Sequence, residues 1–164
     1  MGLTKDYNTK IMTNEALQNL ISLWIPELEF TEEKSQFLNI TVPPEQLIPL
    51  MTQLKSNSET NFDYLFCLSG VDWGKELGVV YHLESTTHRH QLVVKVKTED
   101  RENPTFDTVC KIWYTAEFHE REVFDFFGIQ FTNHPNLKRL FMTEEWDGFP
   151  LRKDYVDEIN MIIK

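Results

Sequence analysis

Residues 78–98, GVVYHLESTTHRHQLVVKVKT, decide the fold of this chain. The segments 78–84 and 90–98 alternate apolar and polar residues, and a short polar stretch separates them. Alternation with a period of two is typical of half-buried strands, and two such strands joined by a tight polar turn form a hairpin. The sequence therefore predicts an antiparallel β-hairpin in the middle of the chain.

Helical and strand-like segments are interleaved on both sides of this hairpin. Apolar residues at helical spacing predict helices over 14–25, 43–55, 104–114 and 116–127, the first capped by Thr13 or Asn14. Strands are expected at 27–30, 36–42 and 62–68, with a polar turn at 31–34 between the first two and Gly70 closing the third. This order predicts an α+β fold, with helices packed on a mostly antiparallel sheet.

The end of the chain follows a different pattern. From Gly128 onward the sequence is mostly irregular and rich in Pro, Gly, Trp and charged residues. A long irregular stretch in a small protein usually serves a function or an interface. We therefore expect a single α+β domain over 1–130 and an extended C-terminal arm over 131–164 that contacts partner subunits.

Composition excludes several classes of protein. The 164 residues carry a formal net charge of -10 and a pI near 4.9, whereas nucleic-acid binders normally carry a basic footprint. No run approaches the roughly 18 apolar residues of a membrane span, and residues 1–6 lack the apolar core of a secretory signal. The expectation is a soluble, intracellular protein that binds no nucleic acid and does not span a membrane.

Motifs for cofactors and catalysis are missing from the sequence. Cys67 and Cys110 are too few to hold an iron–sulfur cluster or a structural zinc, and both read as buried free thiols. The 6 glycines form no nucleotide-binding loop. His88 and His90 are expected in a solvated turn, and His134, before a proline, reads as structural. We expect no catalytic residue, no metal and no cofactor bound by this chain.

Charged and aromatic residues are concentrated in residues 117–129, EFHEREVFDFFGI. On a helix Arg121 and Asp125 are i,i+4 neighbours, and weak solvated ion pairs would account for the charges. Such pairs do not explain why phenylalanines crowd all sides of the next turn, since a helix that is apolar all round is buried all round. Seven of the 12 phenylalanines lie between 118 and 149. We therefore expect a partner to cover part of this helix.

The irregular arm carries the residue types that dominate protein–protein interfaces. Aromatic side chains and arginines supply most of the binding energy at such interfaces. In the arm these anchors are Phe141, Trp146, Phe149 and Tyr155, beside Arg139 and Arg152. The alternative is an arm that wraps only its own core.

These residues resemble the signature of one family, the thirty-kilodalton subunit of respiratory complex I, the proton-pumping NADH:quinone oxidoreductase. The matching motifs are, in order, Glu120-Arg121-Glu122, Asp125 to Ile129, His134-Pro135, Leu137 to Arg139, and Gly148 to Tyr155. Two positions depart from the family pattern. Asn133 stands where a glycine usually precedes His-Pro, and Phe149 stands where a histidine often precedes Pro-Leu-Arg-Lys-Asp.

The resemblance implies a structural and assembly subunit in the peripheral arm of that complex, on the cytoplasmic face of the bacterial inner membrane. Iron–sulfur clusters, FMN and quinone belong to the whole complex, and this chain binds none of them and has no catalytic centre of its own. It would pack against the subunit that resembles the hydrogenase large subunit, near the quinone site, and lie near the terminal iron–sulfur subunit. Ending at Lys164 suggests a polypeptide separate from its large neighbour.

The residues and the resemblance together predict one subunit interface. Its fourteen residues are Glu120, Arg121, Glu122, Asp125, His134, Lys138, Arg139, Phe141, Trp146, Phe149, Arg152, Lys153, Asp154 and Tyr155. The alternative function is the equivalent subunit of a membrane-bound hydrogenase or of a ferredoxin-fed quinone oxidoreductase. A hydrolase that uses Glu120 and Glu122 is a poor reading, because residues two apart on a helix do not face each other.

Overall fold

The computed structural model describes residues 12–26, 28–30 and 35–157. Its elements in chain order are α1 (Asn14–Trp24), β1 (Glu29–Phe30), β2 (Leu38–Thr41), the 3₁₀ turn η1 (Pro44–Gln46), α2 (Leu47–Ser56), β3 (Tyr64–Asp72), β4 (Leu77–Ser85), β5 (His90–Thr98), β6 (Thr105–Asp107), α3 (Ala116–Phe127) and β7 (Gln130–Thr132). Thr13 caps α1 by accepting a hydrogen bond from the Ala16 N–H, as expected for a threonine at this position. The predicted turn at 31–34 lies outside the described residues.

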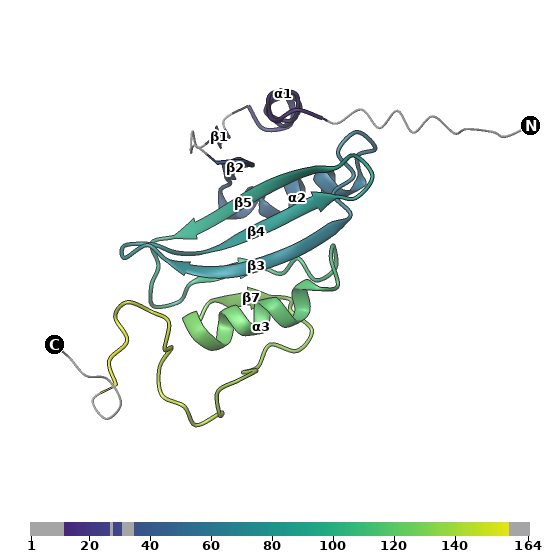
Figure 1. Ribbon diagram of the computed structural model, residues 1–164. Helices are drawn as coiled ribbons and strands as arrows, with labels where there is room; N and C mark the ends of the chain where they lie inside the picture. The colour runs from purple at the N-terminus through teal and green to yellow at the C-terminus, as the bar shows by residue number, and fades with distance from the viewer. Residues whose placement is uncertain (1–11, 27, 31–34, 158–164) are drawn as a thin grey trace, which may run out of the picture.

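Within the described residues, five strands form one sheet in the order β1-β2-β5-β4-β3 (Figure 1). Neighbouring strands are antiparallel except for β2 and β5, which are parallel. The β4–β5 hairpin keeps one register from Leu77 opposite Thr98 to Ser85 opposite His90. The predicted hairpin and the α+β fold class are thus confirmed.

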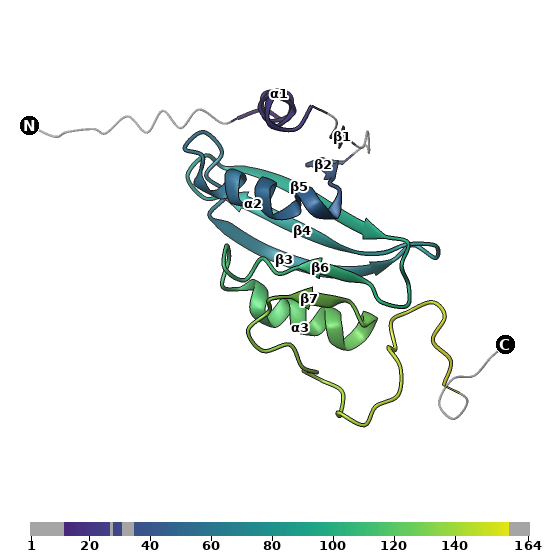
Figure 2. The same ribbon diagram turned by 180° about the vertical axis from the view of Figure 1, so that it is seen from behind.

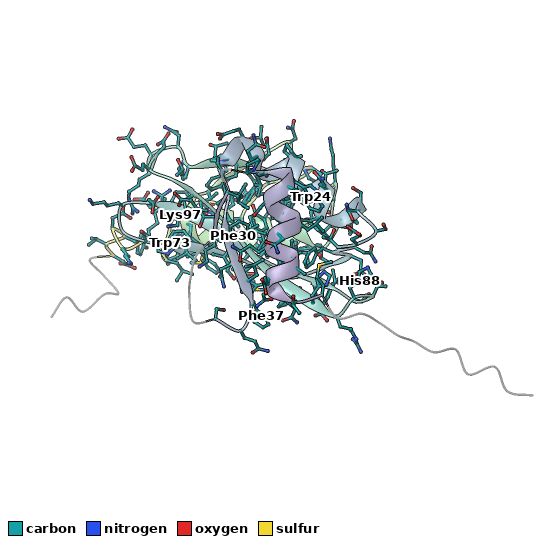
Figure 3. All side chains as sticks on the ribbon, turned by 90° about the horizontal axis from the view of Figure 1, so that it is seen from above. Trp24, Phe30, Phe37, Trp73, His88 and Lys97 are labelled. Atoms are coloured by element: carbon teal, nitrogen blue, oxygen red, sulfur yellow. The ribbon has the colours of Figure 1, made fainter. Side chains whose placement is uncertain are left out.

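The hydrophobic core lies on one face of this sheet, which α2 crosses (Figure 2). Leu50, Met51 and Leu54 of α2 are fully or almost fully buried, and so are Tyr81 and Leu83 of the inner strand β4. A helix with apolar residues at i, i+3 and i+4 presents one such stripe to a sheet. At the end of the β4–β5 hairpin that lies away from its turn, the Nζ of Lys97 lies 4.7 Å from the centre of the Trp73 ring (Figure 3).

A second layer lies beyond the β3 edge of the sheet, where α3 runs beside β7 (Figures 1 and 2). Close packing of α3 on β3 depends on Gly70, because a Cβ there would lie 2.4 Å from a carbon of the Phe127 ring. Gly70 was expected to close the strand, but β3 continues through it to Asp72. The glycine marks the place where a helix approaches the strand closely rather than the place where the strand ends.

The predicted helix over 104–114 is wrong. Thr105–Asp107 forms β6, which pairs in parallel with Gln130–Thr132, and residues 110–115 form turns. The apolar spacing that suggested a helix instead sends Phe106, Val109 and Trp113 into the common core. Pairing with a strand 25 residues further along overrides the local pattern.

After β7 the chain runs as an irregular arm along the outer side of α3 (Figure 1). Residues 133–157 contain no helix or strand, and residues 158–164 lie outside the described part of the chain. None of the helices in the described residues is long and apolar enough to cross a membrane. We refer to residues 133–157 as the arm.

Candidate functional site

The predicted interface residues are organised around α3, which ends at Gly128 in the left-handed conformation with φ of +70°. Glycine adopts this conformation without a steric penalty. A Cβ at Gly128 would also lie 2.4 Å from the Phe149 ring, so the arm passes directly over the end of the helix. The helix carries three acidic or basic residues with little or no exposed surface, Glu120, Arg121 and Asp125.

Glu120 is fully buried and binds the turn that precedes its own helix. Its carboxylate accepts hydrogen bonds from the Val109 N–H at 2.8 Å, from the Thr108 hydroxyl and from the Cys110 thiol at 3.2 Å. Burial raises the pKa of Glu120, and these hydrogen bonds partly oppose the rise. Glu120 therefore stabilises the chain from within and offers no surface to a partner.

Cys110, Glu120 and His134 bring their possible ligand atoms within 4.8 Å of one another, which raises the question of a metal. Burial raises the pKa of the Cys110 thiol to about 12, so the thiol is protonated and acts as a donor. The His134 Nδ1 accepts a hydrogen bond from the Asn136 N–H, and Nε2 donates to the Glu117 carbonyl oxygen at 3.0 Å. With both ring nitrogens used, the chemistry fits a hydrogen-bonded cluster better than a metal site.

The loop before His134 shows how the chain accommodates its departure from the family pattern. Asn133 has φ of +62°, in the left-handed region where glycine is usual. Asparagine tolerates this region better than most residues. Asn133 therefore gives the loop the backbone conformation that a glycine would give it.

Arg121 reaches away from its expected helical neighbour and holds the arm. Its Nε donates to the Lys138 carbonyl oxygen at 3.2 Å, and its Nη2 donates to the Arg139 carbonyl oxygen at 3.1 Å. The guanidinium also lies 5.6 Å from the centre of the Phe118 ring. The expected i,i+4 pair of Arg121 with Asp125 is not formed, because backbone carbonyls and not a carboxylate satisfy the arginine.

Asp125 is the main anchor of the arm. Its Oδ2 accepts hydrogen bonds from three consecutive backbone N–H groups, those of Leu140, Phe141 and Met142, at 2.6–3.0 Å. Its Oδ1 pairs with the Arg139 guanidinium at 3.0 Å. Burial raises the pKa of Asp125, but these donors outweigh burial and hold the pKa below its usual value.

Arg139 extends this anchor along the arm. Its Nη1 also donates to the Asp125 carbonyl oxygen, and its Nη2 donates to the carbonyl oxygens of Trp146 and Gly148 at 2.9 and 3.0 Å. The guanidinium lies 5.2 Å from the centre of the Phe149 ring. One side chain thus connects α3 to the stretch of the arm that ends at Gly148.

The far end of the arm is held by a second set of charges, on the domain side. Arg152 donates to the Phe127 carbonyl oxygen at 2.6 Å and to the Arg101 carbonyl oxygen at 2.9 Å, and stacks 4.9 Å from the centre of the Phe149 ring. The Asp72 carboxylate accepts hydrogen bonds from Nη1 and Nη2 of the Arg101 guanidinium and from the Lys153 N–H. The Arg101 contact holds the pKa of Asp72 well below its usual range.

Asp72 and Arg101 were not among the predicted site residues. Asp72 is the last residue of β3 and Arg101 lies in the β5–β6 connection. No local motif marks them, since their arm partners are 53 to 81 residues away in sequence. Residue type gave no usable signal either, because the sequence does not show that Arg101 becomes half-buried beside a carboxylate.

The structure divides the fourteen predicted residues by exposure. Glu120, Arg121 and Asp125 are buried, and the half-buried members are His134, Arg139, Trp146, Phe149, Arg152 and Tyr155. The exposed members are Glu122, Lys138, Phe141, Lys153 and Asp154. Of the buried residues, Arg121 and Asp125 hold the arm on the domain and Glu120 holds the turn before α3. The interface role of the set stays a prediction.

The histidine turn and the cysteines follow the sequence expectations in part. Arg89 is exposed, but His90 is buried, with its Nε2 3.0 Å from the Thr60 carbonyl oxygen, so the expectation of a solvated His90 is wrong. The ring of His88 stacks on that of His90 at 5.7 Å between ring centres. Cys67 and Cys110 are free thiols and are half-buried rather than fully buried.

Comparison with known proteins gives a consistent result. Residues 40–159 match the family described as "Respiratory-chain NADH dehydrogenase, 30 Kd subunit". The C-type subunit of the NADH-quinone oxidoreductase of Chlorobium phaeobacteroides is 37% identical over 154 residues, which cover 88% of this chain and 92% of that protein. The C/D-type subunit of the NADH-quinone oxidoreductase of Phocaeicola vulgatus is 48% identical over 122 residues, which cover 74% of this chain and 23% of that protein.

Some of these relatives are much longer than this chain. The match spans only 23% of the Phocaeicola vulgatus protein. It spans 47% of the C-type subunit of Chloroherpeton thalassium, which is 46% identical over 114 residues.

Two solved structures share the fold. One belongs to the membrane-bound sulfane sulfur reductase, an archaeal respiratory membrane complex, with a TM-score of 0.74, 27% identity and coverage of 88% of this chain and 86% of that chain. The other is a trypsin-resistant fragment of Nqo5, with a TM-score of 0.65, 26% identity and coverage of 76% of this chain and 100% of that chain.

Proposed function

Because this chain belongs to the 30 kDa subunit family of respiratory-chain NADH dehydrogenase, we propose that it is a structural and assembly subunit of a proton-translocating NADH:quinone oxidoreductase. In this role it binds no redox centre and lies on the cytoplasmic face of the membrane, which it meets only through partners. Its main partner is the subunit that resembles the hydrogenase large subunit, near the quinone site, and the terminal iron–sulfur subunit lies nearby. The C/D name of the Phocaeicola vulgatus relative supports a direct neighbour, because that name joins two subunits in one protein.

The observation that carries the proposal is the way the arm is held. Charge-assisted hydrogen bonds fix its backbone to α3, and large apolar side chains are left on the outside: Phe141 is 64% exposed and Leu151 is 54% exposed. Phe141 stacks on Phe126 of α3 with 5.5 Å between ring centres, and so continues the apolar surface of the helix. An ordered segment with exposed aromatic and aliphatic side chains is typical of a protein–protein interface.

A second candidate has a specific observation in its favour. The sulfane sulfur reductase, whose chain has a TM-score of 0.74 to this one, is a respiratory membrane complex with a different activity. The equivalent subunit of a membrane-bound hydrogenase or of a ferredoxin-fed quinone oxidoreductase would share this fold. The proteins that copurify with the chain distinguish the two candidates, since only the NADH-dependent complex contains a flavin-bearing NADH module.

The test is recovery of the complex from detergent-solubilised membranes through an affinity tag on this chain, followed by mass spectrometry. We expect iron–sulfur and membrane subunits together with the NADH module. The double variant Phe141→Ala/Leu151→Ala should reduce their recovery about tenfold or more, as loss of central apolar contacts does at interfaces. Leu23→Ala removes a side chain that is 79% exposed on α1 and serves as the control. Equal recovery with the double variant and the control would place the interface elsewhere.

A further inference from the structure

A narrow groove runs between β3 and α3 and is bounded at one end by the arm. Its volume is about 190 Å³, and its walls include Leu68 and Gly70 of β3, Glu122 and Phe126 of α3, and Leu151 of the arm. A helix about 10 Å across is too wide for this space, whereas a single long side chain fits. The groove is therefore a receptor for one side chain.

Two features of the fold create the groove. Gly70 has no side chain, so the Phe127 ring packs directly against β3, and α3 lies close enough to the strand to form the second wall of the groove. β3 is also the last strand of the five-stranded sheet, so its outer side pairs with no strand in the described residues. Backbone carbonyls on such an edge are available acceptors for a donor that enters from outside.

Glu122 is the charged residue of this groove, and it differs from the two buried acidic residues of its helix. Glu120 and Asp125 are buried and each accepts at least three hydrogen bonds. Glu122 is exposed, and no hydrogen bond or ion pair joins it to any residue in the described part of the chain. Ser69 is the other polar side chain of the lining, and Glu122 is left without a cation like the one that Asp125 obtains from Arg139.

We propose that the groove receives the side chain of one arginine from a neighbouring subunit, with the guanidinium on Glu122. This inference rests on the proposed function and names the chemistry of the contact. The aliphatic stem of an arginine would lie against Leu68 and Leu151, and its charged head would reach the carboxylate and the face of Phe126. Arginine fits better than lysine because its five donors also serve the carbonyls of a strand edge.

The charge of the surroundings agrees with a basic occupant. The chain carries a net charge of -10, and Glu122 is the one charged residue among those that line the groove. Acidic rims favour the approach of basic surfaces and penalise acidic ones. An acidic surface on another subunit would be repelled from this face.

The experiment uses the assembled complex, with p-benzoylphenylalanine in place of Leu151 or, separately, in place of Phe141. After irradiation we expect the position 151 probe to cross-link to a partner peptide that contains an arginine. Glu122→Gln should then reduce retention of that partner about 30-fold or more, the range for loss of one member of a desolvated charge pair. Glu144→Gln changes an exposed carboxylate outside the groove, so it is the matched control and should retain the partner.

Exchanging the two charges between the partners is the decisive experiment. Glu122→Arg should release the partner, and replacement of the cross-linked partner arginine by glutamate should restore it in that background. Thermal unfolding of the isolated Glu122 variants should match the parent chain, because Glu122 is exposed and makes no polar contact within the described residues.

The outcomes separate this inference from the proposed function. If both probes cross-link to a partner but Glu122→Gln behaves like Glu144→Gln, the arginine contact is wrong and the subunit role stands. A position 151 cross-link to a peptide without arginine also overturns the inference. If neither probe reaches another subunit, the proposed interface itself is wrong.

Discussion

The sheet and the arm are held together by different forces. The sheet and its covering helices bury a continuous apolar core, in which residues such as Ile40, Tyr81 and Leu83 have no exposed surface. In the arm, residues 133–157 are exposed or half-buried, although the His134 side chain itself is fully buried. The order of the arm comes from hydrogen bonds of Asp125, Arg139 and Arg152. Apolar burial is spread over many small contacts, whereas a charge network depends on each member. The arm is therefore the part that a single substitution can detach.

The largest expected effect breaks the arm alone. Asp125→Ala leaves Arg139 and three backbone N–H groups without their acceptor, and loss of one partner of a buried pair costs about 3–5 kcal/mol. We expect native-state hydrogen exchange to show loss of protection at residues 139–142. The amides of the β4–β5 hairpin should keep theirs.

Two further variants serve as comparisons for that result, one outside the anchor and one in the core. Asp147→Ala removes an exposed carboxylate outside the anchor and should leave protection at residues 139–142 unchanged. Leu83→Ala opens a cavity in the core at a cost of about 2–5 kcal/mol, and it should lower protection in the hairpin and the arm together, because the arm docks on the sheet. Equal loss of hairpin protection in Asp125→Ala would show that arm and sheet are a single cooperative unit.

A smaller effect is expected from substitution of Gly128, where the arm crosses the end of α3. Gly128→Ala combines the left-handed backbone, which costs an alanine about 1–2 kcal/mol, with a clash against the Phe149 ring, which adds about 1–3 kcal/mol. Gly74→Ala has the backbone cost alone, since nothing lies within 4 Å of its Cβ position.

Hydrogen exchange at Gly148 and Phe149 should therefore rise in Gly128→Ala and stay unchanged in Gly74→Ala. The free energy of unfolding of the whole domain, from urea titration, should fall by about 1 kcal/mol in the Gly74 variant. If the two variants gave the same arm exchange, the ring of Phe149 would not be packed on the helix end.

The smallest expected effect is the change of stability with pH. Acidification should stabilise the core and should weaken the contacts of the arm. Burial raises the pKa of Glu120, so its ionised form is penalised in the folded core, and acidification from pH 7 towards about 4.3 should stabilise the core. The pKa values of Asp72 and Asp125 are lowered, so their contribution is complete above about 3.9 and is lost as the pH falls below it.

Amide signals in an NMR titration measure both effects. The signals of residues 140–142 and of Lys153 should move to unfolded positions below about pH 3.9, before the hairpin signals do. Glu120→Gln should abolish the stabilisation between about pH 7 and 4.3 without altering release of the arm. Simultaneous loss of arm and hairpin signals would contradict the assignment of these carboxylates to the arm.

Segments with strong local periodicity were predicted correctly from the sequence, and a segment that depends on long-range pairing was not. The hairpin and the helix over 116–127 were predicted because their periodicity is local and strong, and the structure confirms both. The helix over 104–114 failed because the strand pairing of Phe106 with Phe131 is not visible in local spacing. Long-range pairing overrides local propensity in this way in many proteins.

The sequence indicated which charged residues belong to the site, but it did not indicate which groups they bind. Glu120 and Asp125 were singled out, but their partners include backbone groups 11 to 17 residues away, and an N–H carries no sequence signal. Arg121 was expected to pair with Asp125 on the same helix and instead holds two carbonyls of the arm. Residue type indicated where the site is, and the fold decides which partner each side chain binds.

The hydrogen bond between the Lys153 N–H and Asp72 sets an order of events during synthesis. The two residues are 81 positions apart, so at about 5–20 residues per second the carboxylate of Asp72 leaves the ribosome roughly 4–16 s before its partner. In that interval β4, β5 and α3 are all made. The arm therefore closes last on a finished domain, and the surface of α3 stays open to chaperones or to an early-arriving partner until then.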